Sequence, residues 1–228
     1  QGDFGLSEVS RAAYIPVALR YSASPFLEIG VSSALARIDT PGGVVLIDGV
    51  PTPVGGSSPA LRETGMGDTV VRSRFFLLPD RGPGTPTATV TPFFKVKIPT
   101  APEEKGLGTG KTDYGFGVEM DKDFGRAFLF GDAGYTVVGK VPRLGLRNRP
   151  SASIGVGKQL KDAVTASGIL DWRRALIAGN PDPVELTGVL SLKMSPNVTV
   201  SPNAFVGLTN GTSDFGAGIQ MRVTFGGF

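Results

Sequence analysis

The sequence contains no cysteine and no histidine among its 228 residues, and it has a single tryptophan. The absence of cysteine excludes disulfides, thiolate metal sites and a cysteine nucleophile. The absence of histidine excludes the Ser-His-Asp triad, the common zinc sites and the most frequent general base near neutral pH. We therefore expect a protein that is not an enzyme and that uses no metal or other cofactor.

Long apolar runs are missing as well. No stretch approaches 18 consecutive apolar residues, which excludes a transmembrane helix but leaves open a transmembrane barrel, whose strands give a much weaker signal. Charged residues make up 19% of the chain, with a net charge of +3. The only basic cluster is "PRLGLRNR" (142–149), which we interpret as a solvated loop, so no nucleic-acid partner is expected. The chain begins at Gln1 without an apolar signal segment, which indicates a processed form.

The sequence is rich in glycine, with 33 residues, and its apolar and polar side chains alternate regularly. The alternation is clearest in "GFGVEMD" (115–121), "ELTGVLSLKM" (185–194) and "GAGIQMRVTF" (216–225). A period of two residues over this length predicts β-strands and not helices.

The connections between the expected strands alternate between short turns and long loops, which is typical of an up-and-down transmembrane barrel. The short segment 2–10 is needed as a further strand to make the count even. We therefore predict an all-β fold, a single transmembrane up-and-down antiparallel β-barrel of 12 strands that forms one domain over residues 1–228. The other eleven strands are expected at 12–22, 26–38, 68–79, 86–98, 111–121, 126–139, 150–160, 163–176, 183–194, 198–208 and 214–226.

A soluble β-barrel also alternates, but three features favour the membrane. Glycine and long charged side chains share the polar face, the asymmetry of turn length persists along the chain, and aromatic residues such as Tyr14, Tyr114 and Trp172 lie near strand ends. In a membrane barrel the apolar face meets lipid and the polar face lines the lumen. The expected lumen-lining charges are Arg20, Glu28, Arg72, Arg74, Lys95, Lys97, Glu119, Asp132, Asp171, Arg173, Glu185, Lys193 and Arg222.

These charges have two interpretations. They form a structural network of ion pairs that stiffens the barrel, because unpaired charges away from bulk water are costly, or a few of them line a narrow pore for anionic or polar solutes. The strand at 126–139 leaves a second question open. Phe128 and Phe130 share a face with Asp132, so they either narrow the lumen or mark a bulge that shifts the register.

The stretch "GLGTGKTDYG" (106–115) resembles the end of a phosphate-binding loop. Such a loop needs a glycine at position 105, which is Lys105, and a helix after it. An alternating strand follows instead, so no helix N-terminus is available to hold a phosphate. We interpret the stretch as a loop at the barrel rim whose glycines permit a left-handed backbone.

The longest connection, about 39–67, carries an apolar core of Val44, Val45, Leu46 and Ile47. Long loops of this kind are usually functional or disordered. We hypothesise an extracellular loop that folds over the mouth of the barrel as a gate. The alternative is a mobile surface loop.

Several motifs resemble a known family over nearly the whole chain. They are "GMGDTVVRSRFFLLPD" (65–80), the block 93–140 with its "IPT" turn and "GLGTGKTDYG", the closing hairpin 203–225, and the N-terminal pattern 15–45. The family is the outer-membrane channel group labelled "putative MetA-pathway of phenol degradation". The resemblance implies a 12-stranded barrel in the outer membrane of a Gram-negative bacterium and passive transport of small molecules.

The expected function is therefore an outer-membrane channel for small aromatic, hydrophobic or anionic solutes. The alternatives are a closed structural or adhesive barrel whose loops bind a partner, and a soluble ligand-binding barrel. The expected partners are outer-membrane lipid and lipopolysaccharide, a small-molecule solute and the barrel-assembly machinery, to which Phe225 or Phe228 would present the terminal aromatic ring. We expect a monomer.

Overall fold

The computed structural model describes residues 1–3, 9–42, 44–47, 50–53, 60–77 and 88–225. Within these residues the fold is all-β apart from two 3-10 turns, η1 (Glu103–Lys105) and η2 (Pro142–Leu144). No helix in the described part of the chain is long and apolar enough to cross a membrane.

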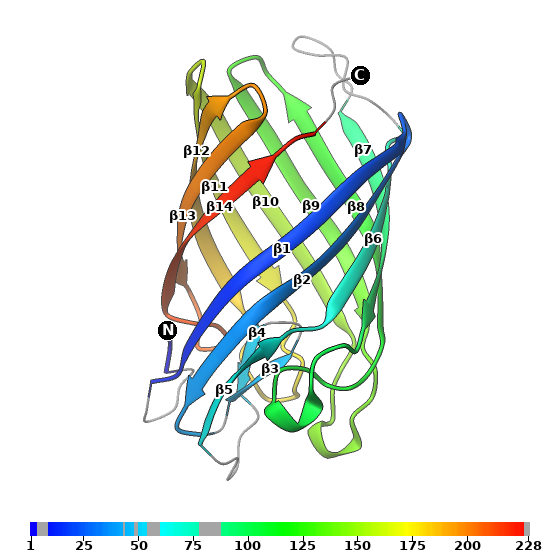
Figure 1. Cartoon of the computed structure of the whole chain (residues 1–228), viewed down its shortest axis with the longest axis vertical. Coiled ribbons are helices and arrows are strands. Elements are labelled where there is room, and N and C mark those ends of the chain that lie inside the picture. The colour runs from blue at the N-terminus through cyan, green and yellow to red at the C-terminus, as the bar shows by residue number, and fades with distance from the viewer. Residues whose placement is uncertain (4–8, 43, 48–49, 54–59, 78–87, 226–228) are drawn as a thin grey trace.

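One antiparallel sheet of twelve strands curls into the wall of a barrel (Figure 1). The prediction of a 12-stranded antiparallel sheet is thus confirmed, and the observed ends lie within a few residues of most predicted ones. The strands are β1 (Arg11–Ser24), β2 (Leu27–Thr40), β5 (Leu61–Met66), β6 (Thr69–Phe75), β7 (Thr89–Ile98), β8 (Asp113–Asp123), β9 (Ala127–Val137), β10 (Arg149–Lys161), β11 (Val164–Arg173), β12 (Val184–Ser195), β13 (Val198–Gly207) and β14 (Phe215–Val223).

The twelve strands differ in two respects from the prediction. β5 and β6 both pair with β2, β5 along Leu35–Thr40 and β6 along Leu27–Ser32, so they are two halves of one interrupted strand. The predicted strand at 2–10 is not a single extended strand, because Gly2 and Ser10 face each other across an isolated bridge. Residues 4–8 lie outside the described residues.

The two ends of the barrel differ in their connections. At one end β1–β2, β10–β11 and β12–β13 are joined by two-residue turns, and the register shifts beside each of these turns. At the other end lie the long connections, which include η1, η2 and a separate hairpin of β3 (Val44–Ile47) and β4 (Val50–Pro53). Figure 1 shows the hairpin and both 3-10 turns gathered at this end, which we call the long-loop end.

Several described parts of the predicted loop 39–67 are strand. β2 extends to Thr40, the hairpin follows, and β5 occupies Leu61–Met66. Val44 packs at the long-loop end in a buried cluster with Ala36, Ile38, Ala101 and Leu107.

The described residues show no ladder between β1 and β14, which are the edges of the sheet. The N-terminal residues hydrogen-bond at both edges. The Gln1 amino group donates to the Phe215 carbonyl at 2.8 Å, and Gly2 and Ser10 exchange backbone hydrogen bonds of 3.0 and 2.9 Å. Residues 1–3 thus lie between the two edges at the long-loop end.

Candidate functional site: the inner face of the barrel

Strand register decides which side chains share a face, because directly opposite residues point the same way. Following the register from β1 to β14 places all thirteen predicted charges on one face. For example, Arg20 lies opposite Gly30, which lies opposite Arg72, which lies opposite Lys95. This face is the concave one, because Arg74 on β6 reaches past β7 to Glu119 on β8. The role of these residues in lining a pore remains a prediction.

The opposite face is apolar and exposed to the surroundings. On the central strand β10, Val156 is 60% exposed and Ile154 is 56% exposed, whereas Gly155 and Gly157 between them face inward and are buried. Phe116 and Tyr135 pack together on this outer face with their ring centroids 5.9 Å apart. Apolar outside and polar inside is the arrangement of a barrel in lipid, the reverse of a soluble sheet protein.

One predicted aromatic anchor lies elsewhere. Tyr14 belongs to the inner face, because it lies opposite Ala36, and it packs against the buried cluster at the long-loop end. The sequence pattern missed this because β1 carries Pro16 and Ala18 on the same face, so the polar phase of the strand is weak.

The strongest ionic contacts on the inner face centre on Glu119. Arg72 donates to Oε1 of Glu119 at 2.5 Å, and Arg74 donates to Oε2 at 2.5 Å from Nη2 and 2.8 Å from Nε. Arg74 also donates to Glu28 at 3.0 Å. The Arg72 guanidinium stacks on the Phe93 ring, 3.9 Å from its centroid. Four charges from β2, β6 and β8 are thus joined in one network, as the ion-pair interpretation expected.

A second group lies on β11 and β12. Arg173 donates to Glu185 at 2.6 Å, and the Thr212 hydroxyl donates to the same carboxylate oxygen. Asp132 accepts a hydrogen bond from Ser153 on the neighbouring strand. The sequence analysis missed Ser153 because a hydroxyl on an alternating strand carries no distinct signal, and it missed Thr212 because that residue lies in the loop between β13 and β14.

The two groups belong to one row across the wall. Glu119 lies opposite Asp132, and Asp171 lies opposite Glu185, with Ser153 between Asp132 and Asp171. Like charges directly opposite each other are unfavourable in a sheet. The row therefore depends on the arginines at its two ends to compensate its negative charge.

Lys97 forms a third, buried group that the sequence analysis found only in part. Its ammonium lies 2.8 Å from Asp113 and 3.3 Å from Asp68, and it donates to the Thr109 hydroxyl at 3.0 Å. All three charged side chains are at most 5% exposed. Asp68 and Asp113 lie inside the predicted strands 68–79 and 111–121, in phase with Arg72 and Glu119, so the alternation already turned them inward although they were not named among the lumen charges. This group ties the loop between β7 and β8 to the wall.

Three of the predicted charges stand apart from these groups. Among the described residues, Arg20, Lys193 and Arg222 have no hydrogen-bond or ion-pair partner, and all three are exposed. Arg20 and Arg222 lie on the edge strands. Lys95 lies across from Arg72 and Gly115.

Aromatic rings on the inner face lie against glycines of the neighbouring strand. A Cβ atom at Gly117 would meet Phe93, and one at Gly155, Gly157 or Gly216 would overlap a phenyl ring. β9 pairs with both neighbours without a register shift, so Phe128 and Phe130 do point inward. The bulge is thereby excluded for β9, and narrowing of the lumen by the two phenyl rings stays a prediction.

The predicted gate residues Val44–Ile47 form strand β3 at the long-loop end. Val44 is 1% exposed and packs with Leu107, which is also 1% exposed. The side chains of Val45, Leu46 and Ile47 lie outside the description. In the loop that brings Leu107 to this cluster, Gly106 and Gly110 both have φ of +63°, as expected for a rim loop that relies on glycine.

No group of three or more acidic side chains among the described residues is arranged to hold a metal ion. The side chains that the inner face brings together are arginine–carboxylate pairs, hydroxyls and phenyl rings. This chemistry suits the passage or weak binding of small molecules.

Comparisons with known proteins agree with this geometry at the level of the fold. No protein-family model matches the sequence, and no curated relative does. Among solved structures, the NanC porin superposes with a TM-score of 0.61 at 12% identity, covering 94% of both chains. An outer-membrane channel from Pseudomonas putida F1 superposes with a TM-score of 0.65 at 11% identity, covering 94% of this chain and 84% of the other. The chain therefore has the fold of the outer-membrane β-barrels.

Proposed function

We propose that the protein is an outer-membrane channel of a Gram-negative bacterium through which small molecules diffuse passively. The observation that carries this proposal is the reversal of faces, with apolar side chains exposed outside and charged side chains turned inward along the whole sheet. The similarity in fold to a porin and to an outer-membrane channel supports it. The motif resemblance to the phenol-degradation channel group supports the same class.

The solutes that fit best are small and aromatic or anionic. Arginines on β6 and β11 present guanidinium groups to the interior, and phenyl rings on β7, β9 and β13 present flat apolar surfaces. A narrow interior with fixed charges selects by charge and size.

The hairpin β3–β4 is the proposed gate. Val44 packs with Leu107 and Ile38, so the hairpin and the β7–β8 loop meet at the long-loop end. The same packing favours the alternative of a closed adhesive barrel, because it fills part of the mouth.

Conductance in planar bilayers, together with liposome swelling in anionic, cationic and aromatic solutes, tests the proposal. We expect discrete conductance steps for the intact protein and larger steps after deletion of 42–60. Replacement of 44–53 by a glycine–serine segment of equal length is the matched control for loop length, and it should also enlarge the steps. Absence of conductance in the intact protein and in both variants would support the closed barrel. Conductance unchanged by both variants would exclude the gate.

A further inference from the structure

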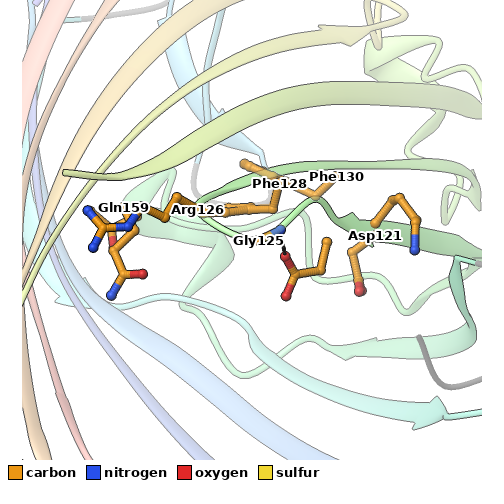
Figure 2. A pocket seen from close by; sticks show the side chains of 9 residues that line it. Asp121, Gly125, Arg126, Phe128, Phe130 and Gln159 are labelled. Carbon is orange, nitrogen blue, oxygen red and sulfur yellow. Dashed lines mark hydrogen bonds between the residues drawn. The ribbon is translucent and has the colours of Figure 1, made fainter. Parts of the chain in front are cut away.

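A hollow of ≈ 500 Å³ lies inside the barrel at the short-turn end of β8–β11. Its floor is formed by Phe128 and Phe130, and its polar margin includes Asp121, Arg126, Gln159 and Thr165 (Figure 2). None of the ion-pair groups described above includes these residues. The hollow is therefore a separate feature of the interior, beyond the charged row.

The two phenyl rings form a fixed aromatic floor. The ring centroids lie 5.8 Å apart, and the ring planes are inclined by 29°, which is a stacked arrangement. Each ring lies against a glycine of β10, where any Cβ atom would overlap it. Rings held in this way keep one face toward the hollow, which is the geometry for stacking a planar molecule.

The polar groups at the margin carry opposite charges. The Arg126 guanidinium and the Asp121 carboxylate have no hydrogen-bond or ion-pair partner among the described residues. Asp121 lies directly opposite Phe130 in the register. The backbone N–H of Gln159 donates a hydrogen bond of 2.6 Å to the backbone carbonyl of Arg126. Figure 2 shows Arg126 and Gln159 on one side of the phenyl pair and Asp121 on the other.

We propose that this hollow is a binding site for a small aromatic carboxylate that carries a hydroxyl group opposite its acid. The ring stacks on Phe128 and Phe130, the carboxylate pairs with Arg126, and the hydroxyl donates to Asp121. Guanidinium–carboxylate pairs are strong and directional, and a carboxylate acceptor at the far end fixes the orientation. The inference deepens the proposed function, since it assigns a solute class to a channel whose transport is itself proposed.

Other charged groups near the hollow fit this assignment. Oδ1 of Asp123 accepts the Gly125 amide at 2.6 Å, so this carboxylate is used in the turn. Lys122 also lines the hollow, and its ammonium lies 6.0 Å from the ring of Phe124, which belongs to the turn. The hollow therefore has two cationic side chains, and we assign the carboxylate of the solute to Arg126 because it lies beside the phenyl pair in Figure 2.

Calorimetric titration of the purified, detergent-solubilised protein with 4-hydroxybenzoate tests the site without any transport. We expect saturable binding, weakened about tenfold in Arg126→Gln through loss of the charged hydrogen bond and several-fold in Phe128→Leu through loss of stacking. Gly157→Ala should weaken binding similarly, because it displaces the Phe128 ring. Arg174→Gln, at the other end of the barrel, is the charge-matched control and should bind normally. Circular dichroism checks that each variant is folded.

Three further ligands test the chemical class of the solute. Cyclohexanecarboxylate should bind more weakly than benzoate, and benzoate more weakly than 4-hydroxybenzoate. Equal binding of the first two would overturn the aromatic floor, and tighter binding of 4-hydroxybenzylamine would overturn the carboxylate assignment. If the protein conducts normally but does not bind 4-hydroxybenzoate, the proposed binding site is wrong and the proposed channel function stands. If it binds 4-hydroxybenzoate but does not conduct, the binding site is supported and the channel function is wrong.

Discussion

The continuous wall from β6 to β12 and the edges formed by β1 and β14 differ in how their polar groups are satisfied. On the wall each strand has two antiparallel neighbours, and its inner arginines meet carboxylates from other strands. At the edges, β1 pairs only with β2 and β14 only with β13. Arg20 and Arg222, which these strands turn inward, have no partner among the described residues.

The comparison separates two requirements of a membrane barrel. Both regions keep apolar residues on the outer face, although β1 also turns Pro16 and Ala18 inward. Among the described residues, the outer edges of β1 and β14 have no ladder partner, whereas the strands between them pair on both sides. Unpaired backbone groups in lipid cost several kcal/mol each, so we expect the edges to be the least stable part of the described barrel.

Hydrogen exchange gives the largest expected difference between the two regions. Amides of β1 that point away from β2, and amides of β14 that point away from β13, should exchange at least about a thousandfold faster than those of β9 and β10, whose opening requires global unfolding. Mass spectrometry of the protein in detergent micelles measures this. Equal protection would mean that the edges are paired in solution, and it would remove the contrast between the regions.

Charge removal gives a smaller difference. Glu119→Gln should destabilise the fold by about 2 kcal/mol, because Arg72 and Arg74 lose their shared carboxylate in a partly buried position. Arg222→Gln at the edge should change stability by less than about 0.5 kcal/mol. Urea unfolding followed by the fluorescence of Trp172 reports both. Similar losses in the two variants would show that the edge charge is as well partnered as the wall charge.

Added methyl groups give the smallest difference. A Cβ at Gly117 lies 2.8 Å from the Gly134 backbone, so Gly117→Ala should cost about 1 kcal/mol or more. A Cβ at Gly218 on β14 meets only the Asn203 side chain, 3.3 Å away, which can move. Gly218→Ala should therefore be neutral within about 0.5 kcal/mol. Thermal unfolding of both variants tests this, and a costly Gly218→Ala would indicate tight packing at the edge.

Most of the wall could be predicted from the sequence because each strand repeats one local rule. Strands such as β8 and β12 alternate strictly, so their faces follow from parity alone. Asp68 and Asp113 were not named among the lumen charges, although the phase of the predicted strands 68–79 and 111–121 turns them inward. Their pairing with Lys97 joins segments far apart in the chain, and no local pattern encodes such a contact.

The sequence alone determined the all-β class and the alternation of faces, because a period of two is a local property of each strand. The thirteen predicted charges share one face for the same reason, but Asp68, Asp113 and Asp121 lie on that face as well. Only the tertiary structure decided which of these charges meet, that β5 and β6 share one place beside β2, and that Phe128 and Phe130 lie flat on glycines of β10. Those features depend on the register between strands and on the curvature of the sheet, which are set by hydrogen bonding and packing across the whole barrel.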